Sequence, residues 1–138
     1  MALTSGLVTL ALRDPAASQL ELEAVRLTAL LESARSEARA SGLSVRWVPG
    51  RSADASADAP DFRFVGLPRR LALPERWLDA EVTAEVIGTR AITLGPEPLI
   101  GAQRIVLRLA DRRLELATDG LGPFVVAPEA AEPGANKP

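Results

Sequence analysis

The clearest pattern in the chain is an apolar stripe with helical spacing. Its members recur at alternating steps of four and three residues, which places them on one face of a helix. They are Leu20, Ala24, Leu27, Leu31, Ala34, Ala38 and Ser41. Asp14 suits the N-cap, Pro15 the first turn and Gly42 the C-terminal stop. The pattern therefore predicts one helix over residues 15–41.

Polar residues near the ends of this helix allow further interpretations. Ser18 and Glu21 have the spacing of a capping box, so a second helix start overlaps the first. Arg35 and Arg39 lie in the last turns, where positive charge suits the helix dipole. We expect both arginines to be solvated.

After Gly42 the apolar period changes from helical to alternating, which predicts half-buried strands. The alternating positions are Leu43, Val45 and Trp47; Phe62 and Phe64; Val82, Ala84 and Val86; Ile92 and Leu94; Ile105, Leu107 and Leu109; Leu114 and Leu116; and the stretch PFVVA. Asp111 and Arg112 separate RIVLRL from RLELA, which favours a hairpin. We predict an α+β fold with a β-rich region over residues 43–128.

Four aromatic side chains belong to the predicted core. Trp47, Phe62, Phe64 and Trp77 occupy positions that are more often buried than exposed. An exposed Trp77 would instead mark an interface.

Composition excludes several classes of function. The 138 residues suit one domain, and 16 basic against 18 acidic residues give a net charge of −2, which does not favour a nucleic-acid partner. The chain has no Cys, His or Tyr, so it lacks an imidazole base, a thiol nucleophile and the usual zinc ligands. We expect no metal and no cofactor, and a binding or structural role gains weight.

Acidic residues offer a weak calcium hypothesis. The stretch from Pro49 to Asp61 is small and polar, and we expect a mobile surface loop there. Its acids are Asp54, Asp58 and Asp61. Because the ligand spacing, turn glycine and closing glutamate of an EF-hand are missing, calcium binding is disfavoured.

Acidic residues also offer a weak catalytic hypothesis. Asp79 and Glu81, two apart on a predicted strand, would share a face, and Glu97 is a further carboxylate. No pattern of oxyanion donors accompanies them. We therefore expect no catalytic residues.

The first twelve residues are apolar on most sides. A helix over 15–41 is already about 40 Å long, so a helical extension would project beyond a domain of this size. We expect residues 1–14 to be the remnant of a hydrophobic N-terminal helix that contacts membrane or partner helices. The contact residues would be Leu3, Leu7, Val8, Leu10 and Leu12. The alternative is a first core strand with Leu7, Thr9 and Ala11 on one face.

The stretches LELEAVRLTALLESARSEARASGLSVRW, FRFVGLP, LPERWLDAEV, LGPEPLIGAQRIVLRL and LATDGLGPFVVAP resemble the H-type minor pseudopilins of bacterial type II secretion, a family that includes the type IV pilus protein FimT. The resemblance covers roughly residues 3 to 128. It implies a pilin-like fold, in which a long N-terminal helix packs on antiparallel sheets. It also implies a subunit without enzymatic activity near the pseudopilus tip.

The resemblance further implies partners and a location. The partners would be the minor pseudopilins I, J and K and the major pseudopilin G. The full-length protein would be held in the inner membrane by a single N-terminal helix, with its globular domain in the periplasm. The family's processing site, a Gly before a Phe with a following Glu, is missing here, so we expect Met1 to fall inside the second half of that helix and the chain to be soluble.

Two alternatives stay open. One is a FimT-like pilin that binds DNA, which needs clustered Lys and Arg. The pairs Arg69–Arg70 and Arg112–Arg113 are short, and we expect them to be a solvated rim. The other is an unrelated non-catalytic α+β binding domain. The tail over 129–138 carries Glu129 and Glu132 against Lys137, which disfavours DNA, and its composition predicts disorder.

Overall fold

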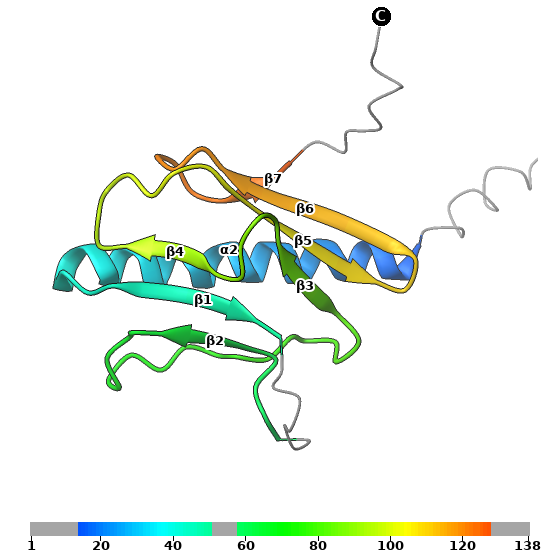
Figure 1. Cartoon of the computed structure of the whole chain (residues 1–138). Coiled ribbons are helices and arrows are strands. Elements are labelled where there is room, and N and C mark those ends of the chain that lie inside the picture. Colours follow the sequence, from blue (N-terminus) through cyan, green and yellow to red (C-terminus); the bar gives the residue numbers. More distant parts are fainter. Residues whose placement is uncertain (1–13, 51–57, 128–138) are drawn as a thin grey trace, which may run out of the picture.

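The computed structural model describes residues 14–50 and 58–127, and it shows one long helix lying across two antiparallel sheets (Figure 1). The elements are α2 (Pro15–Ser41), β1 (Val45–Pro49), β2 (Phe62–Val65), β3 (Thr83–Val86), β4 (Ile92–Gly95), β5 (Gln103–Leu109), β6 (Arg112–Thr118) and β7 (Val125–Val126). The first sheet has the order β2-β1-β4 and the second the order β3-β5-β6-β7. The predicted α+β class is confirmed, and the arrangement is consistent with a pilin-like architecture.

Helix α2 begins and ends where its caps predict. The Asp14 carboxylate accepts a hydrogen bond from the Ala16 N–H at 2.9 Å, and Pro15 opens the helix. Gly42 adopts φ 66°, the left-handed conformation of a C-terminal cap. Because the Asp14 carbonyl also accepts from the Ser18 N–H, Asp14 is the N-cap, and the alternative start at Ser18 is wrong.

The apolar stripe of α2 forms the middle of the core. Its members from Leu20 to Ala38 are buried against β1, β4, β5 and β6, whereas Ser41 is exposed. Burying a large aliphatic side chain contributes about 1.5–3 kcal/mol. The stripe is therefore occupied by the sheets of its own domain.

The four aromatic side chains cluster as predicted. The Trp47 and Phe62 rings are fully buried, with ring centroids 5.6 Å apart, and Trp77 lies with its centroid 4.7 Å from that of Phe62. Phe64 is partly buried and packs against the same cluster. Because Trp77 is only 7% exposed, it is a core residue and does not mark an interface.

The predicted hairpin is also confirmed. β5 and β6 pair in antiparallel register from Gln103–Thr118 to Leu109–Arg112, with Ala110 and Asp111 in the turn. Ile105, Leu107 and Leu116 face the helix and are buried. The other face of β5 carries Arg104 and Arg108, which are exposed.

Several expectations fall on residues outside the described ranges. They concern the apolar start over 1–13, the centre of the loop after Pro49, and the tail over 129–138. Within the part that is described, no helix combines the length and the apolar character needed to span a bilayer.

Candidate interaction surfaces

Arg35 is buried, so the prediction that it is solvated is wrong. Its side chain is 2% exposed, and its guanidinium donates to four backbone carbonyls. Nη1 donates to Gly122 at 2.7 Å, and Nη2 donates to Gly120, Leu121 and Pro98 at 2.9, 3.1 and 3.2 Å. Arg39, four residues later, is exposed as predicted.

These contacts hold two loops together, one between β4 and β5 and one between β6 and β7. The Ile100 N–H also donates to the Gly120 carbonyl at 3.1 Å, so the loops bond to each other as well as to the helix. Each loop presents one large apolar side chain to solvent. Leu99 is 62% exposed and Leu121 is 63% exposed. We call this surface the Arg35 loop pair.

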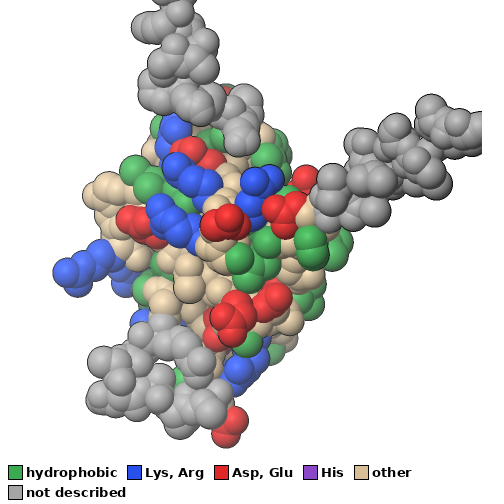
Figure 2. Space-filling view, turned by 90° about the vertical axis from the view of Figure 1, so that its right-hand side faces the viewer, with side chains coloured by type: hydrophobic (Ala, Val, Ile, Leu, Met, Phe, Trp, Pro, Cys, Tyr) green, Lys and Arg blue, Asp and Glu red, His purple; other side chains and the backbone are tan. Residues whose placement is uncertain are grey.

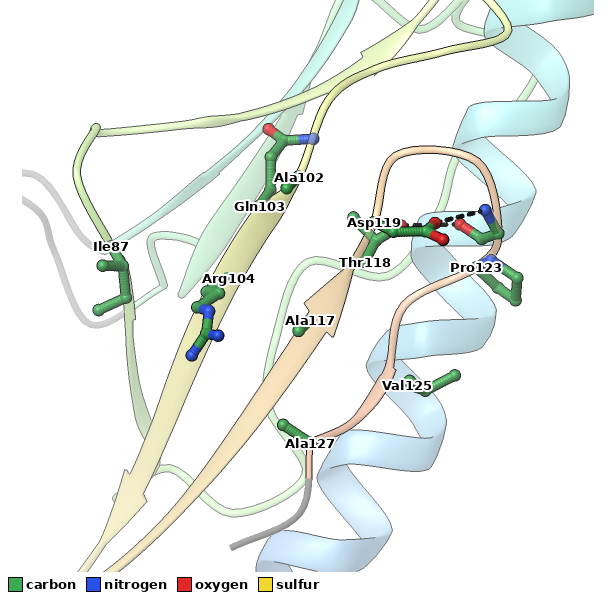
Figure 3. Close-up of a pocket in the computed structure, with 11 residues that line it drawn as sticks. Ile87, Ala102, Gln103, Arg104, Ala117, Thr118, Asp119, Pro123, Val125 and Ala127 are labelled. Atoms are coloured by element: carbon green, nitrogen blue, oxygen red, sulfur yellow. Dashed lines mark hydrogen bonds between the residues drawn. The ribbon is translucent and has the colours of Figure 1, made fainter. Parts of the chain in front are cut away.

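A groove of about 740 Å³ lies beside the second of these loops, on the outer face of the second sheet (Figure 3). Small side chains line its middle and larger apolar ones its sides. Among its lining residues are Ala102, Ala117, Ala127, Ile87 and Val125. The groove is therefore largely apolar, with polar side chains from Gln103, Arg104 and Asp119 also in its lining.

The loop beside this groove is held by its own side chains. The Asp119 Oδ1 accepts from the N–H groups of Leu121 and Gly122 at 2.9 and 3.0 Å, and Thr118 Oγ1 donates to the Gly122 carbonyl at 2.8 Å (Figure 3). The hydrogen bonds from Gly122 and Leu121 lower the pKa of the Asp119 carboxyl below its ordinary value, and the charge of Arg35 adds to this. The loop is therefore held by hydrogen bonds from its own residues.

Glu23 is the second buried charge on α2. Its side chain is 0% exposed and accepts from the N–H groups of Leu78 and Asp79 at 3.2 and 2.8 Å. It thereby holds the turn between β2 and β3 against the helix. Leu78 in this turn is 59% exposed. Two apolar side chains of the helix are also exposed, Leu22 to 57% and Val25 to 67%.

Two of the acidic residues weighed as catalytic or calcium-binding, Asp61 and Asp79, accept hydrogen bonds from backbone N–H groups. Asp79 and Glu81 lie in a turn before β3, where the Asp79 carboxylate accepts from the Glu81 N–H at 2.9 Å, so the expectation that they share a strand face is wrong. Asp61 accepts from the Trp77 N–H at 2.9 Å, and Glu97 lies exposed in the first loop of the Arg35 loop pair. Among the described residues no cluster of acids could hold a metal ion.

The two arginine pairs do not form one basic surface. Arg70 pairs with Glu37 at 2.7 Å and Arg112 with Asp14 at 3.0 Å. Glu37 and Asp14 lie near opposite ends of α2, about 34 Å apart along the helix axis. Figure 2 shows basic and acidic side chains interspersed on the face that carries the helix start. This arrangement does not favour binding to a phosphate backbone.

Leu3, Leu7, Val8, Leu10 and Leu12 lie outside the described residues, so the prediction that they contact partners stays a prediction.

The sequence held a signal for the two buried charges. Glu23 follows Leu20 by three positions, and Arg35 follows Leu31 by four, so both share the face of the apolar stripe.

Comparisons of this chain with protein-family models, with curated proteins and with solved structures found no match.

Proposed function

We propose that this chain is a minor pseudopilin of the H type, a structural adaptor near the tip of the type II secretion pseudopilus. In this role it supports protein export across the outer membrane and carries out no catalysis. We further propose that it acts at the inner membrane, with the domain described here in the periplasm.

The observation that carries this proposal is the relation of α2 to the rest of the chain. The helix has 27 residues, packs one face on two antiparallel sheets, and is directly preceded in sequence by an apolar segment. A pilin-like subunit needs these two parts, because one half of its long helix holds the globular domain and the other half meets membrane or neighbouring helices.

The partner contacts follow from which apolar groups are occupied. The stripe of α2 is buried in its own domain and is not free for a partner. We assign the contacts with the I, J, K and G pseudopilins to the apolar side chains that precede Pro15 in the sequence. The Arg35 loop pair also exposes two leucines, Leu99 and Leu121, and it serves as the control surface in the binding experiment.

Native mass spectrometry of the chain mixed with the soluble domains of the I, J, K and G pseudopilins tests the proposal. We expect a complex with at least one of them. The double variant Leu7→Asp/Leu10→Asp should weaken this complex more than about tenfold, because two apolar contacts are lost. The control Leu99→Asp/Leu121→Asp introduces the same charges on the loop pair and should leave the complex unchanged.

Two results would contradict the proposal. If none of the four domains binds, the adaptor role fails. If only the loop-pair variant weakens the complex, the contact surface is wrongly assigned. A labelled DNA duplex added at micromolar protein should show no shift, and a salt-dependent shift would favour the FimT-like alternative.

A further inference from the structure

Gln103 joins the two sheets through hydrogen bonds from its side chain. Within the described ranges, every strand pairing lies inside one sheet or the other. Gln103 is the first residue of β5, and its amide reaches Thr93 in β4. Oε1 accepts from the Thr93 N–H at 2.8 Å, and Nε2 donates to the Thr93 carbonyl at 3.0 Å. A strand of the second sheet is thus bonded to a strand of the first.

The Gln103 amide takes the place of a peptide group from a neighbouring strand. β4 pairs with β1 on one side, and among the described residues no strand pairs with it on the other. In an antiparallel ladder, the N–H and C=O of one residue point to the same side. Those of Thr93 point to the free edge, where the amide of Gln103 supplies one acceptor and one donor. Gln103 therefore satisfies both groups that Thr93 would otherwise offer to solvent or to another strand.

The contact lies where the chain passes from the second sheet to the first. β3 ends with Val86 opposite Ile105, and the Ile87 N–H still donates to the Arg104 carbonyl at 3.1 Å. Beyond Ile87 the chain diverges from β5 (Figure 3) and then forms β4. Gln103 follows Arg104 in the direction of this divergence, so its amide recaptures the departing segment at Thr93.

We propose that Gln103 is a latch between the two sheets, which holds β4 beside the start of β5 and closes the edge of β4. Opening of this latch frees the N–H and C=O of Thr93 without unfolding the domain, because α2 packs on strands of both sheets. An uncovered edge of this kind promotes pairing with other chains, and a side chain that occupies it prevents this. The latch concerns the two sheets alone and does not depend on the role in secretion.

Amide hydrogen exchange of the full chain, followed by NMR, tests the latch. The Thr93 N–H should exchange slowly in the unaltered chain. Gln103→Ala removes its acceptor and should speed its exchange at least about tenfold. The Leu27 N–H, in the middle of α2, reports opening of the whole fold, and its exchange should change far less.

Two further variants separate the amide contact from other effects of substitution. Gln103→Asn keeps the amide but shortens the side chain by one methylene, so it should speed exchange of the Thr93 N–H as Gln103→Ala does. Arg104→Ala is the matched control, because Arg104 is the next residue of β5 and its exposed side chain bonds to Glu115 at 2.7 Å. This control should leave the exchange of the Thr93 N–H unchanged.

Three results would overturn the latch. The first is fast exchange of the Thr93 N–H in the unaltered chain, and the second is an equal effect of Gln103→Ala and Arg104→Ala. The third is an equal increase at Thr93 and Leu27 in Gln103→Ala, because the substitution would then act through the stability of the whole fold.

Discussion

Helix α2 carries two buried charges of opposite sign, and each holds irregular backbone in place. The Arg35 guanidinium donates to four carbonyls in two loops, whereas the Glu23 carboxylate accepts from two N–H groups in one turn. The difference lies in what each side chain joins. Arg35 connects segments that follow β4 and β6, in different sheets, while Glu23 fixes a single turn between β2 and β3. Hydrogen bonds from these two helix side chains thus hold loops that have no regular structure of their own.

Removing Arg35 should have the largest effect on stability. Arg35→Met keeps most of the side-chain volume but leaves the carbonyls of Pro98, Gly120, Leu121 and Gly122 without these donors. We expect the free energy of unfolding to fall by about 3–5 kcal/mol, since four hydrogen bonds from a buried charged group are lost. Urea denaturation at neutral pH measures this.

The neighbouring Arg39 provides the control for that variant. Arg39 is exposed on the same helix, and Arg39→Met should change the free energy of unfolding by less than about 0.5 kcal/mol. Equal effects of the two substitutions would show that Arg35 matters only through helix propensity or net charge.

Removing Glu23 should cost less, because fewer backbone groups depend on it. Glu23→Ala leaves the N–H groups of Leu78 and Asp79 without their acceptor, and we expect a loss of about 2–3 kcal/mol. Glu23→Gln retains one acceptor oxygen and should cost roughly half as much. The exposed Glu21→Ala serves as the control in the same urea titrations. If Glu23→Ala matched Glu21→Ala, the hydrogen bonds to the turn would contribute nothing to stability.

The sequence predicts the regular elements well because their causes are local. Periodicity identified α2 and the β5–β6 hairpin, and Asp14, Pro15 and Gly42 gave the helix ends within a residue. These signals depend on neighbours within a few positions along the chain. The core aromatics were predictable for the same reason.

The sequence does not reveal what the buried charges bind. The partners of Arg35 lie 63 to 87 positions away, in loops whose sequence carries no sign of the contact. Arg35 also lies near the C-terminal end of the helix, where arginines are usually solvated, although its position places it on the buried face. Asp79 and Glu81 were misplaced because an alternating pattern was extended into a turn that Glu23 holds.

A glycine substitution distinguishes contact between the loops from contact with the helix. Gly120 has φ 97°, and a Cβ there would lie 2.6 Å from the backbone nitrogen of Gly101 in the facing loop. Gly120→Ala should therefore cost about 2 kcal/mol through backbone strain and the separation of the loops.

Gly101→Ala is the matched comparison. Gly101 also has a positive φ, 83°, but a Cβ there meets no atom within 4 Å. This variant should lose only about 1 kcal/mol through backbone strain. Thermal unfolding of both variants compares them, and a greater loss for Gly101→Ala would contradict close packing between the loops.

The smallest effect should appear at low pH and come from Asp119. Hydrogen bonds from the Gly122 and Leu121 N–H groups lower its pKa below the ordinary 3.8, so the carboxylate stabilises the folded chain fully above the unfolded pKa. This contribution decreases as the pH falls below about 4 and is lost as the pH passes through the folded pKa. Asp119→Asn should reduce stability at pH 7 but flatten the dependence on pH between about 2 and 4. Urea midpoints measured across that range compare the two proteins. If their pH profiles run parallel, the Asp119 carboxylate does not stabilise the loop that Arg35 holds from the other side.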